Sequence, residues 1–157
     1  MKANLNKLAR EVVEKNQFLT LATADLKNNP WVSPVVYSFD KDWNFYFVSI
    51  PGSKHGRLIK NNKQVAAVIY DSRQLIGQTA GLYIEGTVRE LSLREFPAAA
   101  AIVFKRKYPY GGWNQAFDEI FKKFMQRKLY HFYKITPVKT WINDQDSDID
   151  ERVEVKL

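Results

Sequence analysis

A short basic turn contains the residues of this chain that are best suited to bind an anion. Ser53, Lys54, His55 and Arg57 follow a Pro-Gly pair and lie where the sequence predicts the start of a helix. A phosphate group needs a hydroxyl donor, fixed positive charge and free backbone N–H groups, and a helix start after a glycine-containing turn supplies all three. An ordinary solvated turn with a helix cap is the alternative, because short basic turns are frequent and this pattern is not a P-loop.

Several other chemistries lack the residues that they need. The sequence contains no cysteine, which excludes disulfides, thiolate nucleophiles and cysteine-ligated metals. The two histidines, His55 and His131, are far apart in sequence and have no carboxylate at metal-ligand spacing, so no metal site is expected. Redox chemistry in this chain would therefore need a bound cofactor.

The net charge of +7 and the aromatic content of 14% leave open nucleic acid, an anionic cofactor or plain solubility. The basic residues do not follow the aromatic residues along any set of strands, which makes single-stranded nucleic-acid binding the weaker alternative. Tyr108 and Tyr110 lie beside the basic cluster at 105–107 and could cover a substrate pocket or stack on a base. The four tryptophans are expected in the core or in an interface.

The first half of the chain reads as a helix followed by strands. Apolar residues at spacings of three and four predict an amphipathic helix over residues 4–15. Residues 18–24 form a predicted strand, and 31–39 with 43–49 form a predicted β-hairpin. Pro34 lacks the N–H that a ladder needs, so its strand is expected at a sheet edge or to be bulged there.

Further strands and helices follow the basic turn. Residues 65–71 and 81–91 are predicted strands, the first of them more buried. Ser92 and Glu95 have the spacing of a capping box, which predicts a helix from Ser92 to Lys107 despite Pro97. The remaining predictions are a second helix around 113–124, strands at 130–135, 138–143 and 151–157, and an acidic surface loop at 144–151.

Length and composition indicate one folded domain. At 157 residues, with 45% hydrophobic and 26% charged residues, the chain has the balance of a soluble globular protein. No apolar run is long enough to cross a bilayer, and the charged first residues do not resemble a signal peptide, so we expect a cytoplasmic protein. Strands joined by short turns favour an antiparallel sheet, and closing that sheet into a small barrel with flanking helices removes its exposed edges.

The order of these segments resembles the pyridoxamine 5'-phosphate oxidase-like, flavin-binding split-barrel superfamily, and most closely a small bacterial subgroup of it. The likeness covers nearly the whole chain, from the N-terminal helix through the segments FLTLATAD, SPVVYSFD, FYFVS, SKHGRLI, QVAAVIYD, YIEGTVREL and ITPVKTW. The resemblance implies an α+β, mainly β fold: one antiparallel split β-barrel of Greek-key type with flanking helices, spanning residues 1–157.

The resemblance also implies where FMN would bind. Ser53, Lys54 and Arg57 would hold the phosphate, and His55 would either bind the phosphate or orient the turn. Ser49 and the backbone of Pro34, Val35, Val36 and Tyr37 would face the ribityl chain and the ring. Gln78 lies three residues before Gly81, the position at which the oxidase has a flavin-contacting glutamine.

By the same resemblance, the protein would be a homodimer with flavin at the subunit interface and an FMN-dependent oxidoreductase acting on a small molecule. The alternatives are a flavin-binding module without turnover, or a barrel that binds a deazaflavin or haem. The C-terminal segment 144–157 lacks the Arg- and His-bearing pattern of the true oxidase, so pyridoxamine phosphate oxidase activity is not expected. The resemblance assigns no catalytic residue to the protein.

Overall fold

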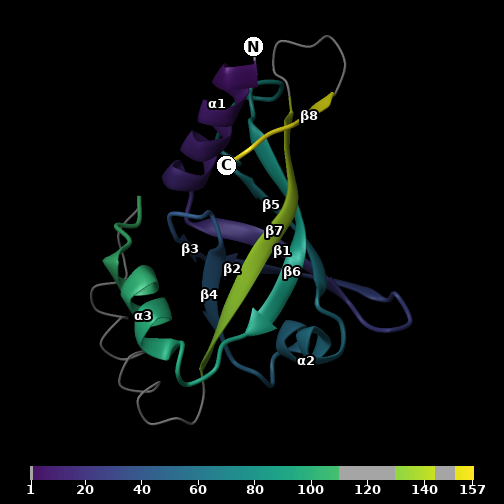
Figure 1. Ribbon diagram of the computed structural model, residues 1–157. Helices are drawn as coiled ribbons and strands as arrows, with labels where there is room; N and C mark the ends of the chain where they lie inside the picture. The colour runs from purple at the N-terminus through teal and green to yellow at the C-terminus, as the bar shows by residue number, and fades with distance from the viewer. Residues whose placement is uncertain (1, 110–129, 144–150) are drawn as a thin grey trace.

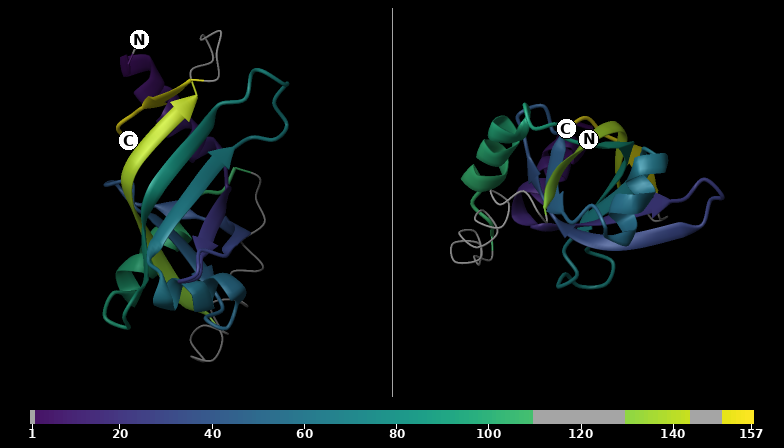
Figure 2. Two further views of the ribbon diagram at one scale, coloured as in Figure 1. Left: turned by 90° about the vertical axis from the view of Figure 1, so that its right-hand side faces the viewer. Right: turned by 90° about the horizontal axis from the view of Figure 1, so that it is seen from below.

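A computed structural model describes residues 2–109, 130–143 and 151–157 of the chain. The described strands form one antiparallel sheet in the order β2-β1-β5-β6-β7-β4-β3, and β8 pairs with β7. The sheet curls into a half-barrel around its core (Figures 1 and 2). The strands are β1 (Phe18–Ala24), β2 (Pro30–Val36), β3 (Ser38–Phe39), β4 (Phe45–Ser49), β5 (Gln64–Tyr70), β6 (Gly81–Glu90), β7 (His131–Asn143) and β8 (Arg152–Glu154).

Three helices of the described chain flank this sheet, as Figure 1 shows. The helix α1 (Lys2–Lys15) buries Ala9 and Val13 completely at one end of the barrel, and α2 (Lys54–Asn61) lies at the opposite end. The helix α3 (Phe96–Lys105) lies outside the sheet. The arrangement confirms the expected α+β, mainly antiparallel split barrel.

Alternation along the strands divides the buried residues into two clusters. Phe45 and Phe47 of β4 point into the barrel, where Phe47 stacks on Tyr133 of β7 with ring centres 5.0 Å apart. Tyr46 and Phe132 point outward and pack under α3. One face of β4 and β7 thus builds the main core, and the other holds α3.

The predicted strand over 31–39 is divided at Tyr37. β2 pairs with β1, with Pro34 opposite Thr20, whereas β3 leaves that ladder and pairs with β4. The change of partner follows from Tyr37, whose ring is fully buried and whose hydroxyl donates to the Val13 carbonyl at 2.6 Å. β2 lies at one end of the strand order, which confirms the edge position expected from its proline.

The two strands predicted at 130–135 and 138–143 are in fact one continuous strand, β7. The pairing of β6 with β7 shifts register between Glu85 and Gly86, so that Gly86 lies opposite Pro137. A Cβ atom on Gly86 would lie 2.6 Å from the Thr136 carbonyl oxygen, so only glycine fits this close approach. A β-bulge with a glycine therefore accommodates the proline without ending the strand.

The predicted helix start at Ser92 is also corrected. The Ser92 N–H and hydroxyl do bond Glu95, but α3 begins only at Phe96. The Glu95 carboxylate is also bound by the Arg89 guanidinium, at 2.5 and 2.9 Å, which ties this turn to β6. Pro97 consequently falls in the first turn of α3, where no backbone N–H is required.

The predictions for Tyr110, for the helix around 113–124 and for most of the acidic loop lie outside the described residues. None of the described helices is long and apolar enough to cross a membrane.

Candidate functional site

The barrel is open on one side between β2 and β4. β3 is two residues long and, among the described residues, pairs with Phe45 and Tyr46 alone, at the start of β4. Next to the rest of β4 lies a pocket of about 230 Å³. It is lined by Phe18, Pro34, Val35, Val36, Tyr46, Phe47, Val48, Ser49, His55, Val103 and Tyr108.

This pocket brings together residues that were singled out in different parts of the sequence. Pro34, Val35 and Val36 come from β2, Ser49 from the end of β4, and His55 from α2. Tyr108, considered above as a cover for a pocket, does line this one, and its hydroxyl lies 2.9 Å from Ser38 Oγ. Phe18 and Val103 also line the pocket but were not predicted to, because no local pattern in the sequence shows which strand or helix residues face a gap in the sheet.

His55 connects the pocket to the basic turn. Its Nε2 lies 2.6 Å from Ser49 Oγ and its Nδ1 lies 3.1 Å from Ser33 Oγ. Burial lowers the pKa of the half-buried His55 ring below its usual value of 6.5, so the ring is mainly neutral at neutral pH. With both ring nitrogens bound to serine hydroxyls and no fixed charge, His55 is better suited to orient the site than to bind a phosphate.

The N-terminus of α2 supplies free backbone donors. Ser53 is the N-cap residue, and its hydroxyl accepts from the Gly56 N–H at 3.1 Å. The N–H groups of Lys54 and His55 have no acceptor in the described part of the chain, as is usual for a first helical turn. A Cβ on Gly56 would lie 2.7 Å from the Pro51 carbonyl oxygen, so a glycine lets α2 pack directly on the preceding turn.

The two long basic side chains of the turn point to different partners. The Lys54 ammonium lies 3.9 Å from the centre of the Trp31 ring, on β2. Arg57 Nη1 donates back to the Gly52 carbonyl. Lys54 is therefore held beside β2, whereas Arg57 closes the turn itself.

Two side chains among the residues of the predicted flavin site lie away from this pocket. The Tyr37 ring is fully buried in the core and does not line the pocket, while the flavin contact expected of the Tyr37 backbone stays a prediction. Gln78 is exposed in the loop between β5 and β6, at the end of that hairpin remote from α2 (Figure 2). Neither side chain reaches the pocket within one copy of the chain.

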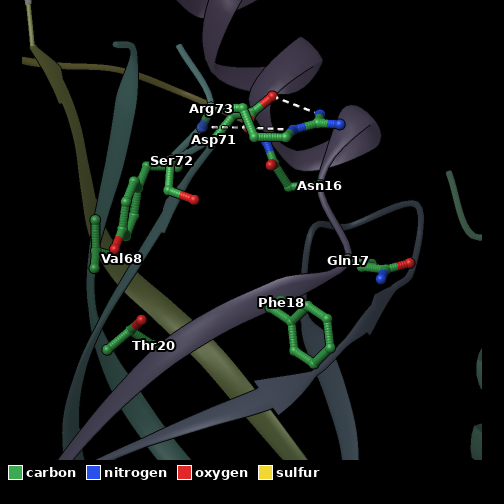
Figure 3. A pocket seen from close by; sticks show the side chains of 9 residues that line it. Asn16, Gln17, Phe18, Thr20, Val68, Asp71, Ser72 and Arg73 are labelled. Atoms are coloured by element: carbon green, nitrogen blue, oxygen red, sulfur yellow. Dashed lines mark hydrogen bonds and ion pairs between the residues drawn. The ribbon is translucent and has the colours of Figure 1, made fainter. Parts of the chain in front are cut away.

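A second pocket, of about 380 Å³, shares Phe18 with the first. Figure 3 shows Phe18 and Thr20 of β1 on one side, and Asp71, Ser72 and Arg73 of the loop after β5 on the other. The Arg73 guanidinium donates to both Asp71 oxygens, at 2.9 and 2.8 Å, and this bond lowers the pKa of the Asp71 carboxyl. Phe18 thus separates a mainly apolar pocket from a more polar one.

Among curated proteins, UPF0306 protein PM1958 of Pasteurella multocida strain Pm70 is similar to this chain. The two are 23% identical over 107 residues, which are 68% of this chain and 70% of that protein.

Solved structures share the fold at low sequence identity. A Clostridium acetobutylicum protein related to general stress protein 26 of B. subtilis, described as of the pyridoxinephosphate oxidase family, superposes with a TM-score of 0.71 at 13% identity over 100% of this chain and 97% of its own. HutZ, the haem storage protein of Vibrio cholerae, superposes with a TM-score of 0.65 at 16% identity, over 85% of this chain and 89% of its own. A FAD-binding protein of Mesorhizobium loti superposes with a TM-score of 0.58 at 17% identity, over 85% of this chain and 88% of its own.

The sequence profile described as pyridoxamine 5'-phosphate oxidase matches residues 5–144, most of the chain. That match includes both the β2–β4 pocket and the whole of α2. The chain therefore belongs to the pyridoxamine 5'-phosphate oxidase family.

Proposed function

We propose that this protein binds a flavin, with FMN as the native form, in the pocket between β2 and β4. The family membership supports the proposal, and so does a neighbour in Mesorhizobium loti that is described as FAD-binding. We propose further that the bound flavin serves an oxidoreductase reaction on a small molecule. When bound, the flavin supplies the capacity to accept and return a hydride or electrons.

The observation that carries the proposal is that His55 belongs to both parts of the site, the helix start and the apolar pocket. Its backbone N–H lies at the open start of α2, and its ring lines the apolar pocket. A flavin mononucleotide has an anionic end and a large, mostly apolar ring, so it needs these two environments side by side. The helix start and the Lys54 charge suit the phosphate, while Val35, Val36 and Phe18 suit the ring.

The chain's own residues would bind and orient the flavin rather than react with it. Ser49 and His55 place hydrogen-bonding groups at one end of the pocket, and the valines exclude water from the rest. Lys54 adds a positive charge that favours the phosphate. No protein nucleophile is needed in such a site.

We propose a homodimer with the flavin at the subunit interface. The outward faces of β2, β1 and β5 carry large apolar side chains that remain exposed in one copy: Val32 is 54% exposed, Phe18 51% and Tyr70 46%. The register places Phe18 opposite Val36 on this face, next to the pocket. A second copy covering this face would bury the apolar side chains and close the pocket together.

The visible absorption spectrum of the purified protein, followed by titration with FMN, tests the flavin proposal. We expect a yellow protein, or one that becomes yellow with about one FMN per chain. A colourless protein that binds neither FMN nor a deazaflavin would contradict the proposal. Light scattering at micromolar concentration tests the dimer, and a flavin-loaded monomer would contradict the shared site.

Haem is a second candidate ligand, favoured by one specific contact. His131 Nδ1 lies against the Glu90 carboxylate, and its Nε2 has no partner among the described residues. A histidine whose second nitrogen is held by a carboxylate is a common arrangement in metal-ligating side chains. HutZ of Vibrio cholerae, a neighbour of the same fold, is described as a haem storage protein.

Titration with hemin separates the two ligands. If haem is the native group, a Soret band should form at one haem per chain and should be lost in His131→Ala. If flavin is the native group, FMN binding should be unaffected by His131→Ala, because His131 does not line the β2–β4 pocket.

A further inference from the structure

We propose that Trp31, Ser33, His55 and Ser49 form a directed hydrogen-bond chain that makes the Ser49 hydroxyl a donor to the ligand in the β2–β4 pocket. The chain favours a ligand with a hydrogen-bond acceptor at this point, such as a carbonyl oxygen, an unprotonated ring nitrogen or a hydroxyl oxygen. Identifying that ligand as a flavin rests on the function proposed above; the direction of the chain does not.

The direction is set at Trp31. An indole N–H can only donate a hydrogen bond, and Trp31 Nε1 lies 3.0 Å from Ser33 Oγ. Ser33 is buried, so its own hydroxyl proton needs an acceptor inside the protein. Within the described residues, the acceptor in reach of that proton is His55 Nδ1, at 3.1 Å.

The tautomer of His55 follows from this. If Nδ1 accepts from Ser33, the single proton of the neutral ring is on Nε2, which then donates to Ser49 Oγ at 2.6 Å. The opposite tautomer would direct two donors at Ser33 and leave its buried hydroxyl proton without an acceptor in the described part of the protein, which is unfavourable. Burial also lowers the pKa of His55, so the ring has only one proton to place at neutral pH.

Ser49 is the end of the chain. Its oxygen already accepts from His55, and no other described group lies within hydrogen-bonding distance of its hydroxyl. Ser49 lines the pocket, so its proton is available there to a ligand or to water. Phe47 packs edge-on to the His55 ring, with ring centres 6.2 Å apart. A ligand acceptor at this point would receive the Ser49 hydroxyl proton, whereas a ligand N–H could use only the remaining lone pair of Ser49 Oγ and would leave that proton without the ligand as a partner.

Nitrogen NMR of the ligand-free protein tests the direction of the chain. His131→Gln leaves His55 as the only histidine, so its two ring nitrogens can be assigned without ambiguity. We expect the chemical shift of Nε2 to be that of a protonated ring nitrogen, and the chemical shift of Nδ1 to be that of an unprotonated one. The reverse assignment would overturn the proposal. If His131→Gln does not fold, the wild-type signals that disappear in His55→Gln give the same assignment.

FMN affinity tests what the chain does for the ligand. Ser49→Ala should raise the FMN dissociation constant about 2- to 13-fold, the effect of one neutral hydrogen bond, and Ser49→Thr should restore it. Ser33 does not line the pocket, so Ser33→Ala should weaken FMN only when Ser49 is present. An equal loss from Ser33→Ala in the wild type and in Ser49→Ala would mean that Ser33 acts through the fold, and would overturn the proposal.

These measurements distinguish failure of the inference from failure of the proposed function. Absence of FMN binding together with a protonated Nε2 would reject the flavin but support the direction of the chain. Tight FMN binding with a protonated Nδ1 would support the flavin and reject the directed chain.

Discussion

The ammonium group of Lys54 lies 3.9 Å from the centre of the Trp31 indole ring. This contact links the first residue of α2 to β2, the strand that forms one wall of the pocket. A cation over an indole face at an exposed site contributes roughly 0.5–1 kcal/mol. Lys54 is therefore held at the helix start, where an anionic group would bind.

Lys54→Ala is expected to weaken FMN binding without unfolding the protein. A charge-assisted hydrogen bond contributes about 1.5–3 kcal/mol, which corresponds to roughly a 10- to 150-fold rise in the dissociation constant. Riboflavin lacks the phosphate, so its affinity should barely change in the variant. Lys60→Ala, on the exposed last turn of the same helix, is the matched control and should leave FMN affinity unchanged. An equal loss of riboflavin and FMN affinity in Lys54→Ala would show that Lys54 does not bind the phosphate.

Gly56→Ala is expected to destabilise the protein. Alanine normally favours a helix over glycine by up to about 1 kcal/mol. Here its Cβ would lie within 3 Å of the Pro51 and Ile50 carbonyl oxygens, and such overpacking typically costs about 1–3 kcal/mol. Urea unfolding should show a lower midpoint for Gly56→Ala, whereas Gly52→Ala, which has space for a Cβ, should unfold like the wild type. Equal midpoints for the two variants would contradict this packing of α2.

Arg106 is expected to be a stabilising residue outside the pocket. Its guanidinium donates to the carbonyls of Tyr37, Val13 and Asn16, and so joins the chain after α3 to the end of α1. Replacing it by methionine should cost about 1.5–3 kcal/mol, because hydrogen bonds from a charged donor are lost and the Tyr37 and Asn16 carbonyls lose their described side-chain donor, whereas the Val13 carbonyl keeps the Tyr37 hydroxyl. Lys107→Met, at an exposed neighbouring position, should be near neutral in the same denaturation experiment.

The contact between Glu95 and Arg89 predicts a dependence of stability on acid pH. The hydrogen bonds from Arg89, and then those from Ser92, lower the pKa of Glu95 from its usual 4.5 to about 2. Because the folded-state value is lower, Glu95 stabilises the fold above about pH 4.5, and this contribution is lost as the pH falls toward 2. In this window the stability of Glu95→Gln should fall less steeply than that of the wild type. Glu85→Gln, at an exposed position of β6, is the control, and a wild-type slope in Glu95→Gln would contradict the assignment.

Local signals in the sequence predicted those parts of the structure that depend on neighbouring residues. The missing N–H of Pro34 predicted an edge strand, and Ser53 predicted the start of α2. The start of α3 could not be predicted in this way, because Glu95 is held by Arg89 of β6. The contact of His55 with Ser33 was equally inaccessible, since it joins residues 22 positions apart.

The candidate site, like the fold, could be predicted only in part from the sequence. The resemblance to a known family pointed to Ser49, His55 and the first residues of the Pro34–Tyr37 stretch, and the fold does bring these to one pocket. The resemblance could not show that the Tyr37 side chain is buried in the core, because its hydroxyl bonds a carbonyl of α1 that is 24 positions away in the sequence. Phe18 was missed because strand alternation places its side chain outward, and only the gap between β2 and β4 makes that position part of a pocket.

The measurement that tests the central claim most directly is FMN titration of Val36→Trp, followed by flavin fluorescence. Val36 lines the pocket between β2 and β4, so the larger indole should fill the space proposed for the flavin ring. Val138→Trp, on an exposed position of β7 outside this pocket, controls for the added side chain. We predict that Val36→Trp keeps its circular dichroism spectrum and loses measurable FMN binding, while Val138→Trp binds FMN like the wild type. A folded Val36→Trp variant with wild-type FMN affinity would show that flavin does not bind in this pocket.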